Sequence, residues 1–228
     1  MLYYILFNDY YTPREAVIVF LITIFVYLIS LTLHEFAHSL TAYKMGDPTP
    51  KLMGRLTLNP FKHLSLGGFL MFVLLGIGWA RPVPINPLNF KKYRKGIRLV
   101  SISGILTNFL LGLIAAIIYA ILLSTVGYIN TAMEYLFLIL QYFMVVNSFL
   151  ALFNLIPIYP MDGFNFVSSF MRADNKYIKF NVKNGMKLLL CILLVTLLIE
   201  IIFSFDLLDW YLSILYNYVY LPISFLGV

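Results

Sequence analysis

The sequence is poor in charge: Asp, Glu, Lys and Arg make up 11% of its 228 residues, whereas 61% are hydrophobic. Soluble domains carry roughly 25% charged and 45–50% apolar residues. A chain with so few polar groups cannot cover a water-facing surface, which excludes a soluble globular protein, a disordered chain and a coiled coil. Its apolar runs are continuous, which also excludes the alternating strands of a membrane β-barrel. We therefore predict an all-α polytopic membrane protein.

Cysteine is almost absent as well. The single Cys191 lies inside an apolar run, so a disulfide framework and a cysteine-based metal cluster are excluded. The first apolar stretch has neither a basic leader nor a small-residue cleavage site, and we expect no removable signal peptide. Without repeats or linkers, the sequence predicts one membrane domain over 1–228, with its core at about 16–170 and C-terminal helices at about 187–228.

The apolar runs set the expected number of membrane-spanning helices. Four have roughly the twenty residues that a helix needs to cross the bilayer: 16–43, 97–126, 132–156 and 188–205. Two more are ambiguous, because 64–80 is interrupted by glycines and 210–228 is rich in tyrosine and contains a proline. We expect about four to six transmembrane helices.

The positive charges favour one topology. Of sixteen Lys and Arg, ten lie in 44–98 and five in 172–187. If 64–80 crossed the membrane fully, the basic runs on its two sides would face opposite compartments, against the positive-inside tendency. We therefore expect 64–80 to be a re-entrant loop or β-hairpin, surrounded by protein or lining a cavity.

This topology predicts a multi-pass protein of the cell membrane, with 44–98 and 157–187 on the cytoplasmic side. A basic face beside anionic lipid then accounts for the net charge of +6. We expect membrane lipid, and no nucleic acid, as a partner of this face.

The first long span carries polar residues that are costly in lipid: His34, Glu35 and His38. The spacing His-x-x-x-His places both imidazoles on one helical face, one turn apart, as coordination of one metal ion by two side chains requires. Glu35 is rotated by about 100° from His34. It therefore flanks the predicted metal, where it can take a proton from water.

A catalytic zinc site takes three protein ligands and an open position. The third candidate is Asp162, which follows the span 132–156 after two prolines and precedes Gly163. That span runs towards the cytoplasm, so Asp162 approaches the boundary near which His34 and His38 lie. The alternative is an aspartate that caps a helix or a turn.

These residues resemble a known family. His34-Glu35-Phe-Ala-His38 in a span, followed by Asn154 and by Pro160-Met-Asp162-Gly163, looks like the site-2 protease family of intramembrane zinc metalloproteases, peptidase M50. Three further stretches, 54–63, 78–87 and 103–108, resemble its compact branch, without a PDZ or CBS domain. The resemblance covers about residues 20–170. The sequence departs from that branch at Leu64-Ser65, which stands where an Asp-Pro is usual, and at Ile105 in place of a proline.

The resemblance implies one zinc ion per chain, held by His34, His38 and Asp162, with Glu35 as the catalytic base. It also favours an active-site role for Asn154, which could donate a hydrogen bond to a developing oxyanion or to a ligand; interhelical packing is the alternative. Asn108 shares a face with four small residues, so packing is favoured over catalysis there. For His63, structural and active-site roles stay equally open.

Together these features predict an intramembrane zinc metalloendopeptidase that cleaves client proteins in or near their transmembrane segments. The alternative is a non-hydrolytic membrane protein, either a zinc or proton transporter or an inactive protease homologue. Transport would call for ionisable residues throughout the membrane thickness, whereas the candidates here lie at one depth. An exposed strand edge near 67–78 would pair with an unwound client. The sequence does not indicate the oligomeric state or the client.

Overall fold

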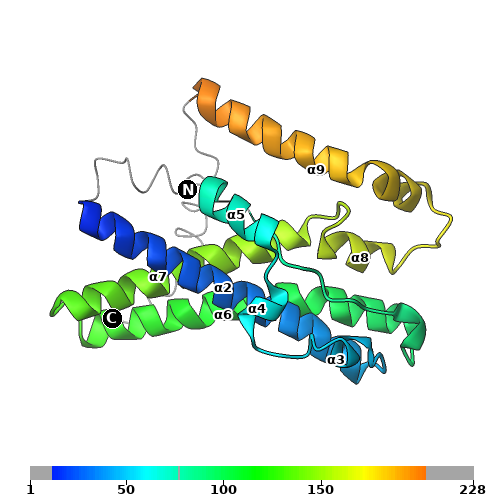
Figure 1. Cartoon of the computed structure of the whole chain (residues 1–228), viewed down its shortest axis with the longest axis horizontal. Helices are drawn as coiled ribbons and strands as arrows, with labels where there is room; N and C mark the ends of the chain where they lie inside the picture. Colours follow the sequence, from blue (N-terminus) through cyan, green and yellow to red (C-terminus); the bar gives the residue numbers. More distant parts are fainter. Residues whose placement is uncertain (1–11, 77, 204–228) are drawn as a thin grey trace.

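A computed structural model describes residues 12–76 and 78–203, and these are helical for most of their length. Three long helices form the body of this part: α2 (Pro13–Lys44), α6 (Tyr93–Thr125) and α7 (Thr131–Leu155). They run alongside one another in Figure 1, and α6 packs against both α2 and α7. All three are long and apolar enough to cross a membrane. The predicted all-α polytopic class is thereby confirmed.

The shorter elements lie between and after these helices. They are α3 (Thr49–Leu52), α4 (Pro60–His63), α5 (Leu66–Leu75), the 3₁₀ helix η1 (Pro87–Asn89) and α8 (Asp162–Ser168). A fourth long helix, α9 (Lys176–Phe203), contains most of the predicted span 188–205. The predicted C-terminal segment 210–228 lies outside the described residues.

Local sequence signals account for the ends of the long helices. Thr12 and Glu15 form a capping box in which each accepts a hydrogen bond from the other's backbone N–H, and Pro13 takes the first helical position. The side chain of Asn130 caps α7 by accepting from the N–H of Met133 at 3.0 Å. These caps fix where α2 and α7 begin, at the end of the bundle away from His34 and His38.

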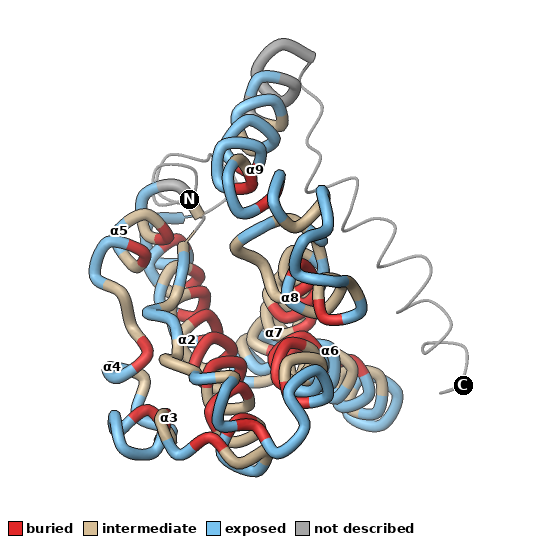
Figure 2. The backbone as a smooth tube through the Cα atoms, turned by 90° about the vertical axis from the view of Figure 1, so that its right-hand side faces the viewer, coloured by how far each residue is buried: buried red, intermediate tan, exposed pale blue. Residues whose placement is uncertain are grey.

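Each of the three long helices has buried residues along one side and exposed residues along the other (Figure 2). Many of the exposed residues are large and hydrophobic. Between α6 and α7 the core is formed by Ala115, Ala116, Leu140 and Met144. Between α7 and α2, the buried amide of Asn147 donates to Ser30 Oγ at 2.8 Å. On the outer face of α6, Phe109 stays 55% exposed, as suits a helix whose surroundings are lipid.

The segment 64–80 is re-entrant and does not span the membrane. Leu64 and Ala80 form an isolated antiparallel bridge, and the N–H of Arg81 donates to His63 O at 2.8 Å, so the chain leaves this excursion where it entered. Between these points α5 has ten residues, or about 15 Å, half the hydrocarbon thickness. The basic runs on its two sides therefore adjoin the same end of the bundle, as the re-entrant prediction requires.

The form of the excursion differs from the β-hairpin that we considered. Residues 67–75 of the expected strand edge belong to helix α5 instead, because this stretch is apolar and a helix satisfies its own backbone groups. Gly68 on α5 allows the outgoing and the returning parts of this segment to touch, since a Cβ on Gly68 would lie 2.1 Å from Trp79 O. The ring of Phe72 on α5 stacks on Tyr27 of α2, with centroids 3.6 Å apart.

Asp47 joins the end of α2 to the chain that enters α6. Its buried carboxylate accepts from the N–H of Asn86 at 2.7 Å, from Asn89 Nδ2 at 2.8 Å, and from both the N–H and the hydroxyl of Thr49. Burial alone would raise the pKa of Asp47, but these donors outweigh it and leave the pKa below its ordinary value.

This network predicts an acid-sensitive contribution to stability. Because the pKa of Asp47 is lower in the folded than in the unfolded chain, its stabilisation is present above about pH 4 and is lost as the pH falls through the folded value. We expect Asp47→Asn to lower the free energy of unfolding at pH 7 by about 1–3 kcal/mol. Thermal unfolding in detergent at pH 7, 5 and 3 checks this, and the loss should shrink at the lowest pH.

The matched control is Asp174→Asn, because the side chain of Asp174 is 68% exposed and pairs only with the exposed Arg172 among the described contacts. It should change little at any pH. Equal losses of the Asp47 variant at pH 7 and pH 3 would contradict the assigned role of the carboxylate.

Candidate metal centre

Helix α2 supplies two imidazoles that face the same point. His34 and His38 lie one turn apart, both 6% exposed, and their Nε2 atoms are 3.0 Å from each other. Two neutral imidazole nitrogens at this distance repel unless a proton or a cation lies between them. The two Nε2 atoms are therefore placed to share a proton or a cation.

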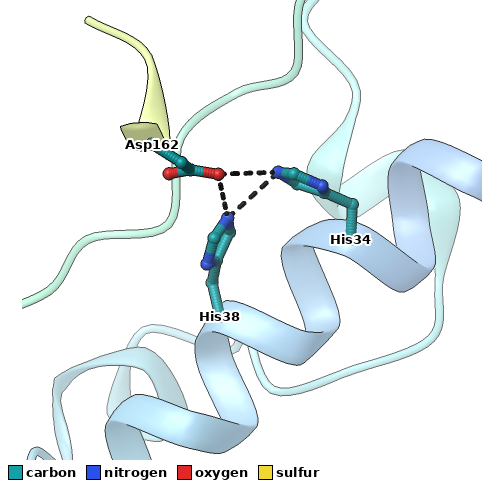
Figure 3. A group of neighbouring side chains, drawn as sticks. All are labelled: His34, His38 and Asp162. Atoms are coloured by element: carbon teal, nitrogen blue, oxygen red, sulfur yellow. Dashed lines mark hydrogen bonds and ion pairs between the residues drawn. The ribbon is translucent and has the colours of Figure 1, made fainter. Parts of the chain in front are cut away.

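Asp162 completes the group from a distant part of the chain. Its Oδ2 lies 3.0 Å from His38 Nε2 and 3.3 Å from His34 Nε2 (Figure 3). One ligand atom from each of the three residues lies within 4.8 Å of the other two. The structure thus brings together the three residues that the sequence predicted as ligands.

The turn after α7 aims Asp162 at the histidines. Helix α7 ends at Leu155, and α8 begins at Asp162 itself after a turn that contains Pro157 and Pro160. A Cβ on Gly163 would lie 2.1 Å from Leu155 O, so only glycine allows α8 to start against the end of α7. The two prolines cannot continue a helix, and Gly163 permits the return.

Helix α6 approaches the two imidazoles closely at Gly104. A Cβ on Gly104 would lie 2.5 Å from His38 Nε2 and 2.6 Å from His34 Cε1. Any larger residue would have to displace the rings. The sequence placed Gly104 in a stripe of small residues for helix packing, and the structure shows that what packs there is the pair of imidazoles.

The other nitrogen of each ring has a partner on α6. His38 Nδ1 lies 2.8 Å from Val100 O, which can only accept, so Nδ1 carries the proton and Nε2 presents its lone pair. The side-chain amide of Asn108 meets His34 Nδ1 at 3.2 Å. In the structure the amide nitrogen Nδ2 faces the ring; the same amide turned over presents Oδ1, which accepts from Nδ1–H and leaves the lone pair on Nε2 of His34.

The role of Asn108 was underestimated from sequence. A helical stripe of small residues favoured packing, and nothing in the spacing shows which side chain of another helix an asparagine will meet. The structure places Asn108 fully buried behind His34, where it orients the ring.

This donor set fits a divalent cation. Two imidazole lone pairs and a carboxylate converge, and Asp162 Oδ2 is buried without a hydrogen-bond partner. Two histidines and one carboxylate are also the ligands of a class of catalytic zinc sites that leave a fourth position for water or substrate. His34, His38 and Asp162 would hold the ion.

Glu35 lies beside this group and is 8% exposed. Its negative charge acts on His38 and on Arg55, whose guanidinium donates to the backbone oxygens of Arg81 and Pro82. Burial lowers the pKa of Arg55, as does the like charge of Arg81, whereas Glu35 raises it. Arg55 thus connects two parts of the structure: it binds the backbone of Arg81 and Pro82, which follow α5, and it interacts electrostatically with Glu35. The sequence contains no signal for this connection.

Two other predicted residues are not among the three that converge. Asn154 is on α7 and donates from Nδ2 to Leu150 O of its own helix at 2.9 Å, so its active-site role stays a prediction. His63 is fully buried, and its Nε2 lies 2.8 Å from Thr57 O. This contact gives His63 a structural role in the turn before α5.

The chain is similar to bacterial proteins whose names refer to zinc metalloproteases. It is 40% identical over 144 residues to "Putative zinc metalloprotease YwhC" of Bacillus subtilis (strain 168), a match that covers 61% of this chain and 64% of the relative. It is 29% identical over 216 residues to "Putative zinc metalloprotease Rip2" of Mycolicibacterium smegmatis, covering 89% of this chain and 77% of the relative.

A third relative carries the same name. "Putative zinc metalloprotease Rip2" of Mycobacterium tuberculosis is 30% identical over 165 residues, which are 69% of this chain and 60% of the relative. The chain therefore spans less than two thirds of the Bacillus subtilis and Mycobacterium tuberculosis proteins. No family model matches the chain, and no solved structure matches it significantly.

The close approach of Gly104 leads to a metal-binding prediction. We expect Gly104→Ala to weaken Zn²⁺ binding at least roughly tenfold, because the added methyl group pushes the two imidazoles out of their shared geometry. The measurement is the dissociation constant from competition with a chelator of known affinity, on purified protein in detergent.

Gly112→Ala is the matched control. Gly112 is buried on the same helix, but its added Cβ would find its nearest neighbour, Ser148 Oγ, at 3.5 Å, an ordinary contact distance. That variant should bind Zn²⁺ within about twofold of the wild type, a free-energy difference of only about 0.4 kcal/mol. Equal affinities of the two variants would show that the contact at Gly104 does not shape the centre.

Proposed function

We propose that this chain is an intramembrane zinc metalloprotease of the site-2 protease family, peptidase M50, and that it hydrolyses peptide bonds in or near transmembrane segments of client proteins. The observation that carries the proposal is the convergence of His34, His38 and Asp162 beside Glu35 within an apolar helix bundle. The names of the relatives support zinc as the ion.

The residues divide the chemistry among them. When bound, zinc supplies a Lewis acid that activates water and polarises the scissile carbonyl. Glu35 accepts the proton of the attacking water on its carboxylate and later delivers it to the leaving amine. Val100 O and Asn108 hold the two imidazoles through their Nδ1 atoms, so that both Nε2 atoms keep facing Asp162.

The depth of the centre supports cleavage within the membrane. His38 and His34 precede Lys44, the end of α2, by six and ten residues, which is about 9–15 Å along the helix. The surrounding helix is apolar enough to span, which supports ligands that lie below the membrane surface. A peptide bond that reaches them belongs to a segment that is itself in or next to the bilayer.

The basic residues support a cytoplasmic position for this end. The bridge between Leu64 and Ala80 brings the basic runs on both sides of α5 to the end of the bundle that carries Lys44. A multi-pass protein of the cell membrane with its basic end in the cytoplasm follows the positive-inside rule. Water would then reach Glu35 from the cytoplasm, and anionic lipid would surround the basic end.

Substitution of Glu35 separates hydrolysis from metal binding. We expect Glu35→Gln to lower the cleavage rate of a reconstituted transmembrane client by roughly 10²–10⁴-fold, because the amide cannot accept the proton of water. Bound zinc should stay at one ion per chain, since Glu35 is not among the three converging ligands. Cleavage is measured in liposomes by gel, and zinc by elemental analysis of the same preparation.

His34→Ala is the companion variant and should lose both zinc and cleavage. If Glu35→Gln cleaved as fast as the wild type, Glu35 would not be the base. If no variant or wild-type protein cleaved while zinc stayed bound, the centre would belong to a non-hydrolytic protein.

A further inference from the structure

Helix α9 leaves the bundle that the three long helices form. In both views it lies apart from α2, α6 and α7 (Figures 1 and 2). Among its described side chains, the buried positions are Asn181, Gly185 and Leu189, which recur every four residues and so form one stripe. This stripe marks the side by which α9 attaches to the rest of the chain.

What the stripe meets is the turn that carries Asp162. Asn181 Oδ1 accepts from the N–H of Tyr159 at 3.4 Å, and the hydroxyl of Tyr177 donates to Pro157 O. Asn181 Nδ2 donates to Tyr177 O at 3.2 Å, which fixes the orientation of the amide. Two side chains of α9 therefore hold the backbone of 157–159, three to five residues before the predicted ligand.

Close packing reinforces these hydrogen bonds. A Cβ on Gly185 would lie 2.8 Å from both Cβ and O of Tyr159, so glycine lets α9 rest directly on the turn. On the other side of Asp162, the buried ring of Phe164 contacts Tyr159 and Tyr177, with centroids 5.8 and 5.9 Å apart. The chain is thus held by α9 before and after Asp162.

We infer that Tyr177 and Asn181 are positioning residues that set the affinity of the metal centre by holding Asp162 in reach of His34 and His38. The inference rests on the proposed metal centre. The two histidines belong to one rigid helix, whereas Asp162 depends on a turn whose prolines offer no N–H for hydrogen bonds. Ligands must be held within about 0.5 Å of their working geometry. The hydrogen bonds from Tyr177 and Asn181 to the turn therefore determine how well the carboxylate is placed.

The test measures Zn²⁺ affinity in the full-length chain. We expect Tyr177→Phe and Asn181→Ala each to weaken binding several-fold, and the double variant by roughly tenfold or more, the range found when partners of metal ligands are removed. Asn181→Asp keeps an oxygen that faces the N–H of Tyr159 and should bind nearly as the wild type does. Dissociation constants come from chelator competition in detergent.

A spectroscopic measurement reports the geometry directly. In Co²⁺-loaded protein, the visible absorption depends on the arrangement of the ligands. The spectrum should change in the double variant and return towards that of the wild type in Asn181→Asp. A purely structural role of α9 would lower the thermal midpoint but leave this spectrum unchanged.

Two control variants match the substitutions. Asn184→Ala removes an amide from the same helix, and Tyr93→Phe removes a hydroxyl from an exposed tyrosine of α6; neither side chain takes part in a described hydrogen bond to 157–159. Both should bind Zn²⁺ within about twofold of the wild type, or about 0.4 kcal/mol. If Asn181→Ala failed to fold, Tyr177→Phe would decide, because it retains the ring that contacts Phe164.

The result for Asp162→Ala separates this inference from the proposed centre. If Asp162→Ala loses Zn²⁺ while the double variant binds it with unchanged affinity and an unchanged Co²⁺ spectrum, α9 does not position the ligand and the inference is wrong. If Asp162→Ala binds Zn²⁺ as tightly as the wild type, the proposed centre is wrong and the inference fails with it.

Discussion

The structure depends on a group of polar side chains that an apolar helix bundle has to accommodate. His34, Glu35 and His38 lie in a helix whose other residues suit hydrocarbon, and exposure of such residues to lipid costs several kcal/mol each. The bundle meets this constraint by surrounding them. α6 presents Gly104 and Asn108 to the rings, and the turn after α7 brings the carboxylate that complements them.

Glycine and proline determine how closely the elements approach this group. Gly104 allows α6 to touch both imidazoles, and Gly163 allows α8 to begin against the end of α7. Gly68 lets the two limbs of the excursion at 64–80 meet. In each case a methyl group would collide with the atom that the glycine approaches, so the substitution would act by displacing that atom.

Much of this arrangement could be predicted from residue types and charge. The His-Glu-x-x-His spacing indicated the two ligands on α2, and the count of spans brought Asp162 to the same membrane boundary. The basic runs indicated that 64–80 returns to its point of entry. These features depend on periodicity and on topology, which a single sequence carries.

The remaining features depend on which side chains meet across different elements. The contact of Asn108 with His34 and that of Arg55 with Arg81 are set by helix rotation and by the path of a loop, and no pattern in the sequence encodes either. The excursion is a helix where a β-hairpin was considered, because apolar residues with interspersed glycines are compatible with both. The contact of Asn181 with Tyr159 has no signal in the sequence either, because it joins two different elements.

The position of Gly104 has a steric consequence for the centre. α6 lies against the imidazole pair at Gly104, and the carboxylate of Asp162 meets the two Nε2 atoms from another element. The protein therefore already occupies two sides of the cluster, so a further ligand of an ion held there has to approach from another direction. The missing methyl group of one glycine thus sets how tightly the helix bundle encloses the three converging side chains.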